Sequence, residues 1–246
     1  MSTPATAPRA ATAVYHAADT RGHADHGWLD SHHTFSFAGY HNPARMNFGV
    51  LRVLNDDVVA PGRGFGAHPH DNMEIVSIPL EGDLTHMDSM GNRTVIKSGD
   101  VQVMSAGTGV RHSEMNANGD REVKFLQIWM FPNARDVEPR YDQITVEPEA
   151  GTWTQVLSPD EDDAGVWVHQ NAWWSIGAFA AGQTVDYRLH DPANNGVYLF
   201  VLEGEGRVGE QALGRRDGLG LSGLDGFAYE ATAEGRVLLM EVPMST

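Results

Sequence analysis

The stretch HPHDNMEIVSIPLEG (68–82) has a counterpart in the second half of the chain, HDPANNGVYLFVLEG (190–204). Both begin with histidine, carry an apolar run and end in Leu-Glu-Gly. A second pair, DVQVMSAGTG (100–109) and DGLGLSGLDG (217–226), shares Asp, Ser and Gly at equal spacing. Similar segments at a fixed offset indicate an internal repeat, here with one loop shorter in the second copy. The alternative is chance agreement in a chain with 27 glycines.

The pattern around these segments indicates β-structure. From Phe48 onward, short β-branched or apolar runs alternate with turn residues, which is typical of a sandwich or barrel. Helical periodicity is confined to a short helix in 132–141. We therefore expect an all-β fold of two tandem barrels with few short helices. The expected division is a flexible arm at 1–13, a first barrel at 14–132, a linker at 133–143 and a second barrel at 144–246.

Composition limits the partners. The chain has 246 residues, 17 basic and 33 acidic, for a net charge of -16, which disfavours direct binding of nucleic acid. It contains no cysteine, so a transition metal would need imidazole, carboxylate or water ligands. No secretory signal pattern and no apolar run of 18 residues occurs, and we expect a cytoplasmic protein without a membrane span.

Two pairs of polar side chains have metal-ligand spacing. His68 and His70 are separated by one residue, as are His112 and Glu114, and residues i and i+2 of a strand point to the same face. On neighbouring strands the four could converge on one divalent metal and leave positions open for substrate. The donor set suits Fe, Mn, Co, Ni, Cu or Zn, with Fe as the first choice.

The second copy of the repeat lacks this set. His190 is the one residue that is kept, at the position equivalent to His68. The positions equivalent to His70 and Glu74 hold Pro192 and Gly196, and those equivalent to His112 and Glu114 hold Tyr229 and Ala231. We therefore expect a metal in the first barrel only. Four further histidines lie in GHADHGWLDSHHTF (22–35), namely His23, His26, His32 and His33. Their mixed spacing favours a covering loop over a second metal site.

Several motifs together resemble the pirin family of two-domain cupins. They are HGWLDSHHTFSF (26–37), GFGAHPHDNMEI (64–75), HMDSMGN (86–92) and MSAGTGVRHSE (104–114). The resemblance implies a bicupin fold, with the metal bound at His68, His70, His112 and Glu114. In many other cupins the carboxylate ligand is the position of Glu74. That residue shares strand parity with the two histidines, and we expect it to support a ligand by hydrogen bonding.

The bacterial members that the chain resembles imply a quercetin 2,3-dioxygenase. Such an enzyme cleaves a flavonol with O2 to a depside and carbon monoxide, and Glu114 would accept the 3-hydroxyl proton. A flat substrate needs an apolar slot, for which the candidates are Phe48, Met73, Met104, Trp129 and Phe131. His86 and Asp88 could order a turn, the preferred interpretation, or could hydrogen-bond a ligand.

Two other functions remain open from the sequence. Eukaryotic pirins resemble regulatory proteins, so the chain could bind a protein partner without turnover. It could also be a cupin enzyme for another chelating substrate, because a fold does not fix a function. Turnover would distinguish the first alternative, and oxygen consumption over a panel of substrates the second.

Overall fold

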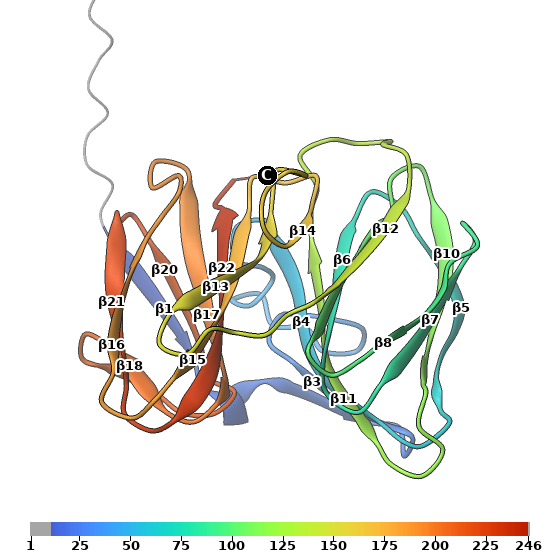
Figure 1. Ribbon diagram of the computed structural model, residues 1–246, viewed down its shortest axis with the longest axis horizontal. Coiled ribbons are helices and arrows are strands. Elements are labelled where there is room, and N and C mark those ends of the chain that lie inside the picture. The colour runs from blue at the N-terminus through green and yellow to red at the C-terminus, as the bar shows by residue number, and fades with distance from the viewer. Residues whose placement is uncertain (1–10, 246) are drawn as a thin grey trace, which may run out of the picture.

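The computed structural model describes residues 11–245 of the chain, which form two β-barrels lying side by side (Figure 1). Within these residues the only helix is the short 3₁₀ helix η1 (Ala18–Thr20). The short helix expected in 132–141 does not form, since this segment is irregular until a strand begins at Arg140. Pro139 explains part of this difference, because a proline disfavours the helical conformation of the residue before it.

The first barrel consists of a large and a small antiparallel sheet. Across the large sheet the strands are β12 (Arg140–Thr145), β9 (Asp100–Ser105), β6 (Glu74–Glu81), β11 (Val123–Met130), β4 (Leu51–Val59), β3 (Leu29–His33) and β2 (Gly22–Asp25). The small sheet contains β5 (Gly64–His70), β10 (Val110–Asn116), β7 (Leu84–Asp88) and β8 (Arg93–Ile96).

The second barrel repeats this order with its own strands. Its large sheet contains β1 (Thr12–His16), β20 (Gly218–Ser222), β17 (Asn195–Glu203), β22 (Gly235–Pro243), β15 (Trp173–Phe179), β13 (Trp153–Ser158) and β14 (Val166–Trp167). Its small sheet contains β16 (Thr184–Arg188), β21 (Gly226–Ala231), β18 (Gly206–Val208) and β19 (Gln211–Leu213). The matching topology confirms the all-β tandem fold.

The two ends of the first barrel's sequence differ from the expected domain borders. Strand β1, first along the chain, pairs with β20 of the second barrel, so Thr12 and Ala13 belong to a strand and not to an arm. Residues 1–10 of the expected arm lie outside the described residues. Strand β12 pairs with β9 of the first barrel, so 140–143 are not linker. Each large sheet is thus completed by a strand that sequence position alone would assign elsewhere.

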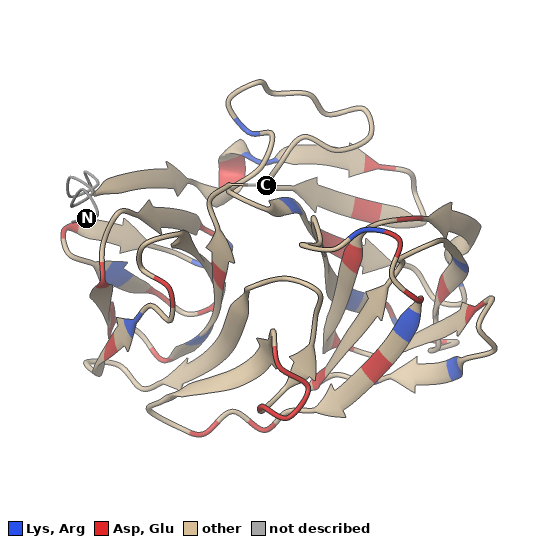
Figure 2. Cartoon of the chain, turned by 90° about the horizontal axis from the view of Figure 1, so that it is seen from above, with Lys and Arg blue, Asp and Glu red and all other residues tan. Residues whose placement is uncertain are grey.

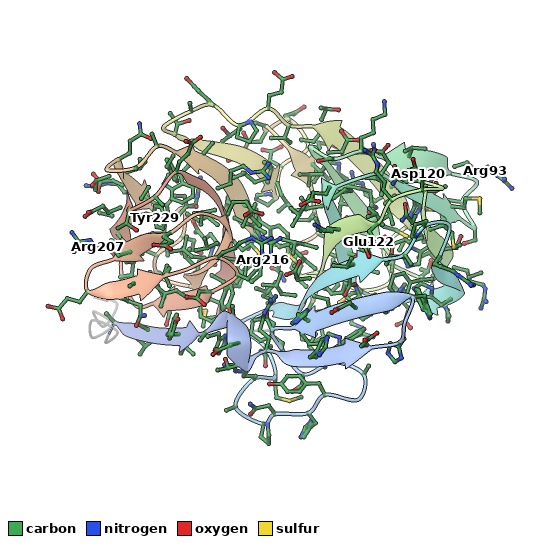
Figure 3. The ribbon with its side chains drawn as sticks, turned by 90° about the horizontal axis from the view of Figure 1, so that it is seen from below. Arg93, Asp120, Glu122, Arg207, Arg216 and Tyr229 are labelled. Carbon is green, nitrogen blue, oxygen red and sulfur yellow. The ribbon has the colours of Figure 1, made fainter. Side chains whose placement is uncertain are left out.

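The large sheets of the two barrels pack against each other. Their facing side chains form one apolar core that includes Val76 and Ile78 of β6 and Tyr198 and Phe200 of β17. Burial of each such side chain stabilises the folded state by roughly 1.5–3 kcal/mol. Arg216, labelled between the barrels in Figure 3, crosses this boundary and donates from Nε to Asp56 of β4 at 2.9 Å.

The interiors of the two barrels differ in kind. In the second, Tyr229 of β21, labelled in Figure 3, packs with Phe179 and Tyr187 in one continuous apolar cluster. In the first, the apolar residues split into two smaller clusters, one around Phe125 and one around Met104. The cavity described below is lined partly by polar side chains of this first barrel.

Figure 2 shows Asp and Glu on both barrels and the described Lys and Arg scattered among them rather than gathered on one face. Among the described residues, no helix has the length and apolar character needed to cross a membrane.

Candidate metal centre and its cavity

Strands β5 and β10 bring three histidines together. Antiparallel pairing sets His68 directly opposite His112, while His70 lies on the same face of β5 two residues on. The centroid separations are 4.5 Å for the His68 and His112 rings, 4.8 Å for His68 and His70, and 4.9 Å for His70 and His112. A nitrogen of each ring lies within 4.8 Å of a nitrogen of the others, a spacing that suits one shared metal ion.

The hydrogen bonding of these rings leaves nitrogens free for a metal. His68 Nδ1 lies 2.7 Å from the carbonyl oxygen of Gly66, to which it donates, so its Nε2 keeps a lone pair. Nε2 of His70 and both ring nitrogens of His112 are buried without a hydrogen-bond partner among the described residues. Buried polar atoms are rarely left unpaired, and a divalent transition metal would satisfy them. The residues present therefore fit such an ion.

The surroundings also keep His70 and His112 neutral, as ligands must be. Burial, reinforced by the neighbouring His68, lowers the pKa of His70 to about 4. Burial and the nearby histidines lower the pKa of His112 to about 2. Neutral imidazole is the metal-binding form, so these rings are available for a metal at any pH near 7.

Glu114 follows His112 on β10 but is positioned by an irregularity. The pairing of β10 with β5 shifts register between the two residues. Gly64 lies close to the β10 backbone here, since an added Cβ would clash with the Glu114 carbonyl oxygen. Ser77 Oγ donates to Oε1 at 2.8 Å and Gln127 Nε2 to Oε2 at 2.6 Å. Burial outweighs these hydrogen bonds and raises the pKa of Glu114 to about 7.

One carboxylate oxygen of Glu114 groups with His112 and His86, while the three-histidine group is formed by His68, His70 and His112. The two groups share His112. The structure therefore brings the histidines of the expected ligand set together and places Glu114 beside them. Ligation by Glu114 stays a prediction.

A cavity of about 690 Å³ opens beside this cluster, and its wall includes His68, Glu114 and Gln127. Its remaining lining comes mainly from the large sheet and from the segment after β3, with Leu29, Phe37, Phe65 and Trp129 among the apolar members. A volume of this size, mostly apolar with a few converging polar groups, is that of a small-molecule site.

One of the five expected pocket residues lies in this wall. Trp129 lines the cavity, and its ring meets that of His70 edge to face at 4.9 Å. Met73 and Met104 pack beside Trp129 in the apolar cluster of the first barrel. Phe48 and Phe131 belong to the core between the barrels. These four residues are not part of the lining, and their selection as pocket residues was wrong.

Glu74 also faces away from the histidines. Its neighbours of like parity on β6, Val76 and Ile78, lie in the core between the barrels, while Ser77, of the opposite parity, reaches Glu114. Ser105 Oγ donates to Glu74 at 2.8 Å. The expected hydrogen bond from Glu74 to a ligand is therefore wrong. The chain turns between β5 and β6, where Asn72 has a φ of 46°, so the alternation of side chains along β5 does not continue into β6.

His86 and Asp88 have the first of the two roles considered for them, ordering a turn, and make no hydrogen bond to a predicted ligand among the described residues. His86 Nε2 lies 3.0 Å from Asp88 Oδ2, and both side chains are fully buried. Asp88 Oδ1 also accepts from the backbone N–H groups of Met90 and Asn92, which orders the turn after β7. The His86 ring lies 5.4 Å from that of His112, so the pair also packs behind one member of the cluster.

Three of the four N-terminal histidines, His23, His32 and His33, lie in strands β2 and β3, where a covering loop was expected, and His26 lies between the two strands. His23 and His32 stack at 4.5 Å, and one Asp30 oxygen lies 3.0 Å from His23 Nε2 and 3.3 Å from His32 Nδ1. This surface group has ligand spacing but is largely exposed. His33, in contrast, is buried, and it lines the cavity together with His23 and His26.

Sequence reasoning missed the polar wall of the cavity formed by β3 and β4. Ser31, His33, Asn55 and Asp57 all line the cavity and are each 3% exposed. The available signal was alternation, since Ser31 and His33 share one face of a strand and Asn55 and Asp57 share another.

Comparison with known proteins agrees with this architecture. A family model described as pirin matches residues 14–130, and one described as the quercetinase C-terminal cupin domain matches 155–242. Quercetin 2,3-dioxygenase of Escherichia coli K12 is 40% identical over 226 residues, covering 92% of this chain and 96% of the relative. A pirin-like protein of Caulobacter vibrioides is 36% identical over 91% of this chain and 96% of its own.

Solved structures point the same way. The bacterial pirin YhhW of Escherichia coli, in complex with nickel(II), superposes with a TM-score of 0.90 at 38% identity over 94% of this chain and 99% of its own. Quercetin 2,3-dioxygenase of Acinetobacter baumannii shares the fold at a TM-score of 0.75 and 20% identity, over 96% of this chain and 80% of its own. The chain therefore belongs to the pirin family of quercetinase-like cupin oxidoreductases.

Proposed function

We propose that the protein binds one divalent transition metal in its first barrel and cleaves a flavonol such as quercetin with O2 to a depside and carbon monoxide. The observation that carries the proposal is the convergence of three imidazoles, two of them with buried unpartnered nitrogens, and one buried carboxylate beside a largely apolar cavity. The relatives named quercetin 2,3-dioxygenase support the choice of substrate.

His68, His70 and His112 would hold the metal, with Glu114 as the fourth ligand. When bound there, the ion would supply Lewis acidity that favours the ionised form of a chelating substrate. Neutral nitrogen donors and one carboxylate keep Fe as the first choice, with Mn, Co, Ni, Cu and Zn as the others. The nickel(II) complex of YhhW is a property of that relative.

The side chains around the proposed metal site would accept a proton, orient the carboxylate and exclude water. Glu114 Oε1 or Oε2 would accept the proton of the 3-hydroxyl, because its carboxylate lies in the cavity wall beside His112. Ser77 and Gln127 hold that carboxylate in one orientation through their hydrogen bonds. Trp129 and Phe37, whose rings meet edge to face at 5.4 Å, form an apolar wall for a flat ring system and exclude water from it.

The test is carbon monoxide release from quercetin in air. The protein is first stripped with chelator, then reloaded separately with Fe(II), Mn(II), Co(II), Ni(II), Cu(II) and Zn(II). Multiple turnovers that need metal are expected, and Glu114→Gln should abolish them. Glu74→Gln is the matched control, since it changes a buried carboxyl of the same barrel that faces the other way.

Lack of carbon monoxide with every metal, despite one bound equivalent, would contradict the proposal. It would favour stoichiometric binding of a protein partner or a different chelating substrate. Oxygen uptake over a panel of enediol-like compounds would then decide between these two. A cytoplasmic location stays a prediction.

A further inference from the structure

A row of buried polar side chains crosses four neighbouring strands of the large sheet of the first barrel. Strand pairing sets His33 of β3 opposite Asn55 of β4, Asn55 opposite Gln127 of β11, and Gln127 opposite Ser77 of β6. None of the four is more than 8% exposed. Since protein interiors are mainly apolar, four polar residues in one row of a barrel require a function.

The polar atoms at the two ends of the row differ in their hydrogen bonding. Gln127 and Ser77 donate their hydrogens to Glu114. At the other end, His33 Nδ1 and Asn55 Oδ1 are buried and have no partner among the described residues, although both residues line the cavity. A buried acceptor without a donor destabilises the protein, so this end is arranged for a donor that arrives with a ligand.

A hydrogen-bonded chain sets the chemical character of His33. Ser31 Oγ donates its one hydrogen to Asp57 Oδ1 and lies 2.8 Å from His33 Nε2. When Asp57 is ionised that hydrogen is used, so Nε2 donates to Ser31 and Nδ1 is left with a bare lone pair. Asp57 is fixed in the wall of the same cavity and makes no ion pair among the described residues. The chain therefore presents an acceptor to the cavity.

An aromatic wall connects this end with the metal cluster. The His70 ring meets Trp129 at 4.9 Å, Trp129 meets Phe37 at 5.4 Å, and Phe37 meets His33 at 5.3 Å, all edge to face. His33 and Asn55 lie on the large sheet, whereas the metal cluster is built on the small sheet. A flat molecule held at the metal by one edge can extend along these rings toward His33.

We propose that His33 and Asn55 form a second subsite, which accepts a hydrogen bond from a phenolic hydroxyl on the part of the substrate remote from its chelating oxygens. The preferred substrates are then polyhydroxylated flavonols, not flavonols that carry only the chelating pair. The identity of the substrate rests on the proposed function. The recognition of a remote hydroxyl rests on the acceptors themselves.

The experiment measures binding, so it does not depend on turnover. Metal-loaded protein is titrated anaerobically with quercetin, which carries four hydroxyls beyond the chelating pair, and with 3-hydroxyflavone, which carries none. The absorbance change of the flavonol gives Kd. His33→Phe keeps a ring but removes the acceptor. His32→Phe is the matched control, because it makes the same change on the next residue, which does not line the cavity.

His33→Phe is expected to weaken quercetin binding by about five- to tenfold, the usual worth of one or two neutral hydrogen bonds. It should leave the Kd of 3-hydroxyflavone within twofold of wild type, which also shows that the barrel is intact. His32→Phe should change neither Kd. Ser31→Ala, which keeps the imidazole but frees its tautomer, should weaken quercetin binding by about threefold.

Equal losses of affinity for both flavonols, or no loss of affinity for either, would overturn the subsite. If His33→Phe does not fold, the Kd values of Ser31→Ala for the two flavonols provide the test. Selective binding of quercetin that depends on His33, without carbon monoxide release under air, would support the subsite while contradicting the proposed dioxygenase activity. Carbon monoxide release under air, with equal effects of His33→Phe on the binding of both flavonols, would support the dioxygenase activity and contradict the subsite.

Discussion

Replacing Asp57 by asparagine should stabilise the protein at pH 8. Burial raises the pKa of Asp57 to about 7, against an ordinary value of 3.8, with Ser31 opposing the change and Asp56 adding to it. The folded state therefore holds a proton between pH 4 and 7 that the unfolded state has released. The wild type loses stability as pH rises through this window, up to roughly 4 kcal/mol for a pKa difference of about 3.

The amide of the Asp57→Asn variant has no such proton to lose, so the variant escapes this loss. In urea unfolding with chelator present, Asp57→Asn should become more stable relative to wild type by about 3 kcal/mol between pH 5 and pH 8, and the difference should then level off. Chelator keeps metal binding from contributing to the measured stability.

Asp56→Asn is the matched control for this prediction. Asp56 neighbours Asp57 on β4 but accepts from Arg21 at 3.1 Å and from Arg216 at 2.9 Å. Its removal should destabilise the protein at every pH, because it leaves two guanidinium groups without their carboxylate. A stability difference for Asp57→Asn that does not vary with pH, or a variant less stable than wild type at pH 8, would refute the reasoning.

Three more changes test other parts of the structure. His68→Ala should lower the metal content well below one equivalent while leaving urea unfolding in chelator unchanged, because His68 is only half-buried at the cavity; full metal retention, measured by elemental analysis, would contradict the ligand set. Arg216→Met should cost about 3 kcal/mol in urea unfolding, since it breaks a buried ion pair between the barrels, and a cost below about 1 kcal/mol would make that pair unimportant. Trp129→Leu should weaken flavonol binding by about tenfold through loss of aromatic contact, with metal content unchanged, and an unaltered Kd would remove Trp129 from the substrate wall.

The sequence was sufficient for the features that depend on local spacing. His68 and His70 share a strand face, and His112 lies opposite on a paired strand, as the two spacings predicted. The tandem barrels followed from a repeat whose strands now match in order, β6 and β9 in one barrel with β17 and β20 in the other. Periodicity and repetition are properties of short segments, so they can be read without coordinates.

Features that depend on distant contacts or on irregular backbone were not predictable. The turn at Asn72 reverses the parity of Glu74, and the register shift after His112 sets the position of Glu114. Large apolar residues such as Phe48 look alike whether they line a cavity or fill a core. The wall formed by His33 and Asn55 depends on pairing between β3 and β4.

The position of β1 has a consequence for how the chain is made. Thr12 of β1 hydrogen-bonds Ser222 of β20, a partner 210 residues further along the chain. At a synthesis rate of roughly 5–20 residues per second, that partner leaves the ribosome about 10–40 s after β1 does. During this interval the edge of β1 has no strand to pair with, and such edges are sites of aggregation. Strand β1 can take its place in the large sheet of the second barrel only after β20 has been synthesised.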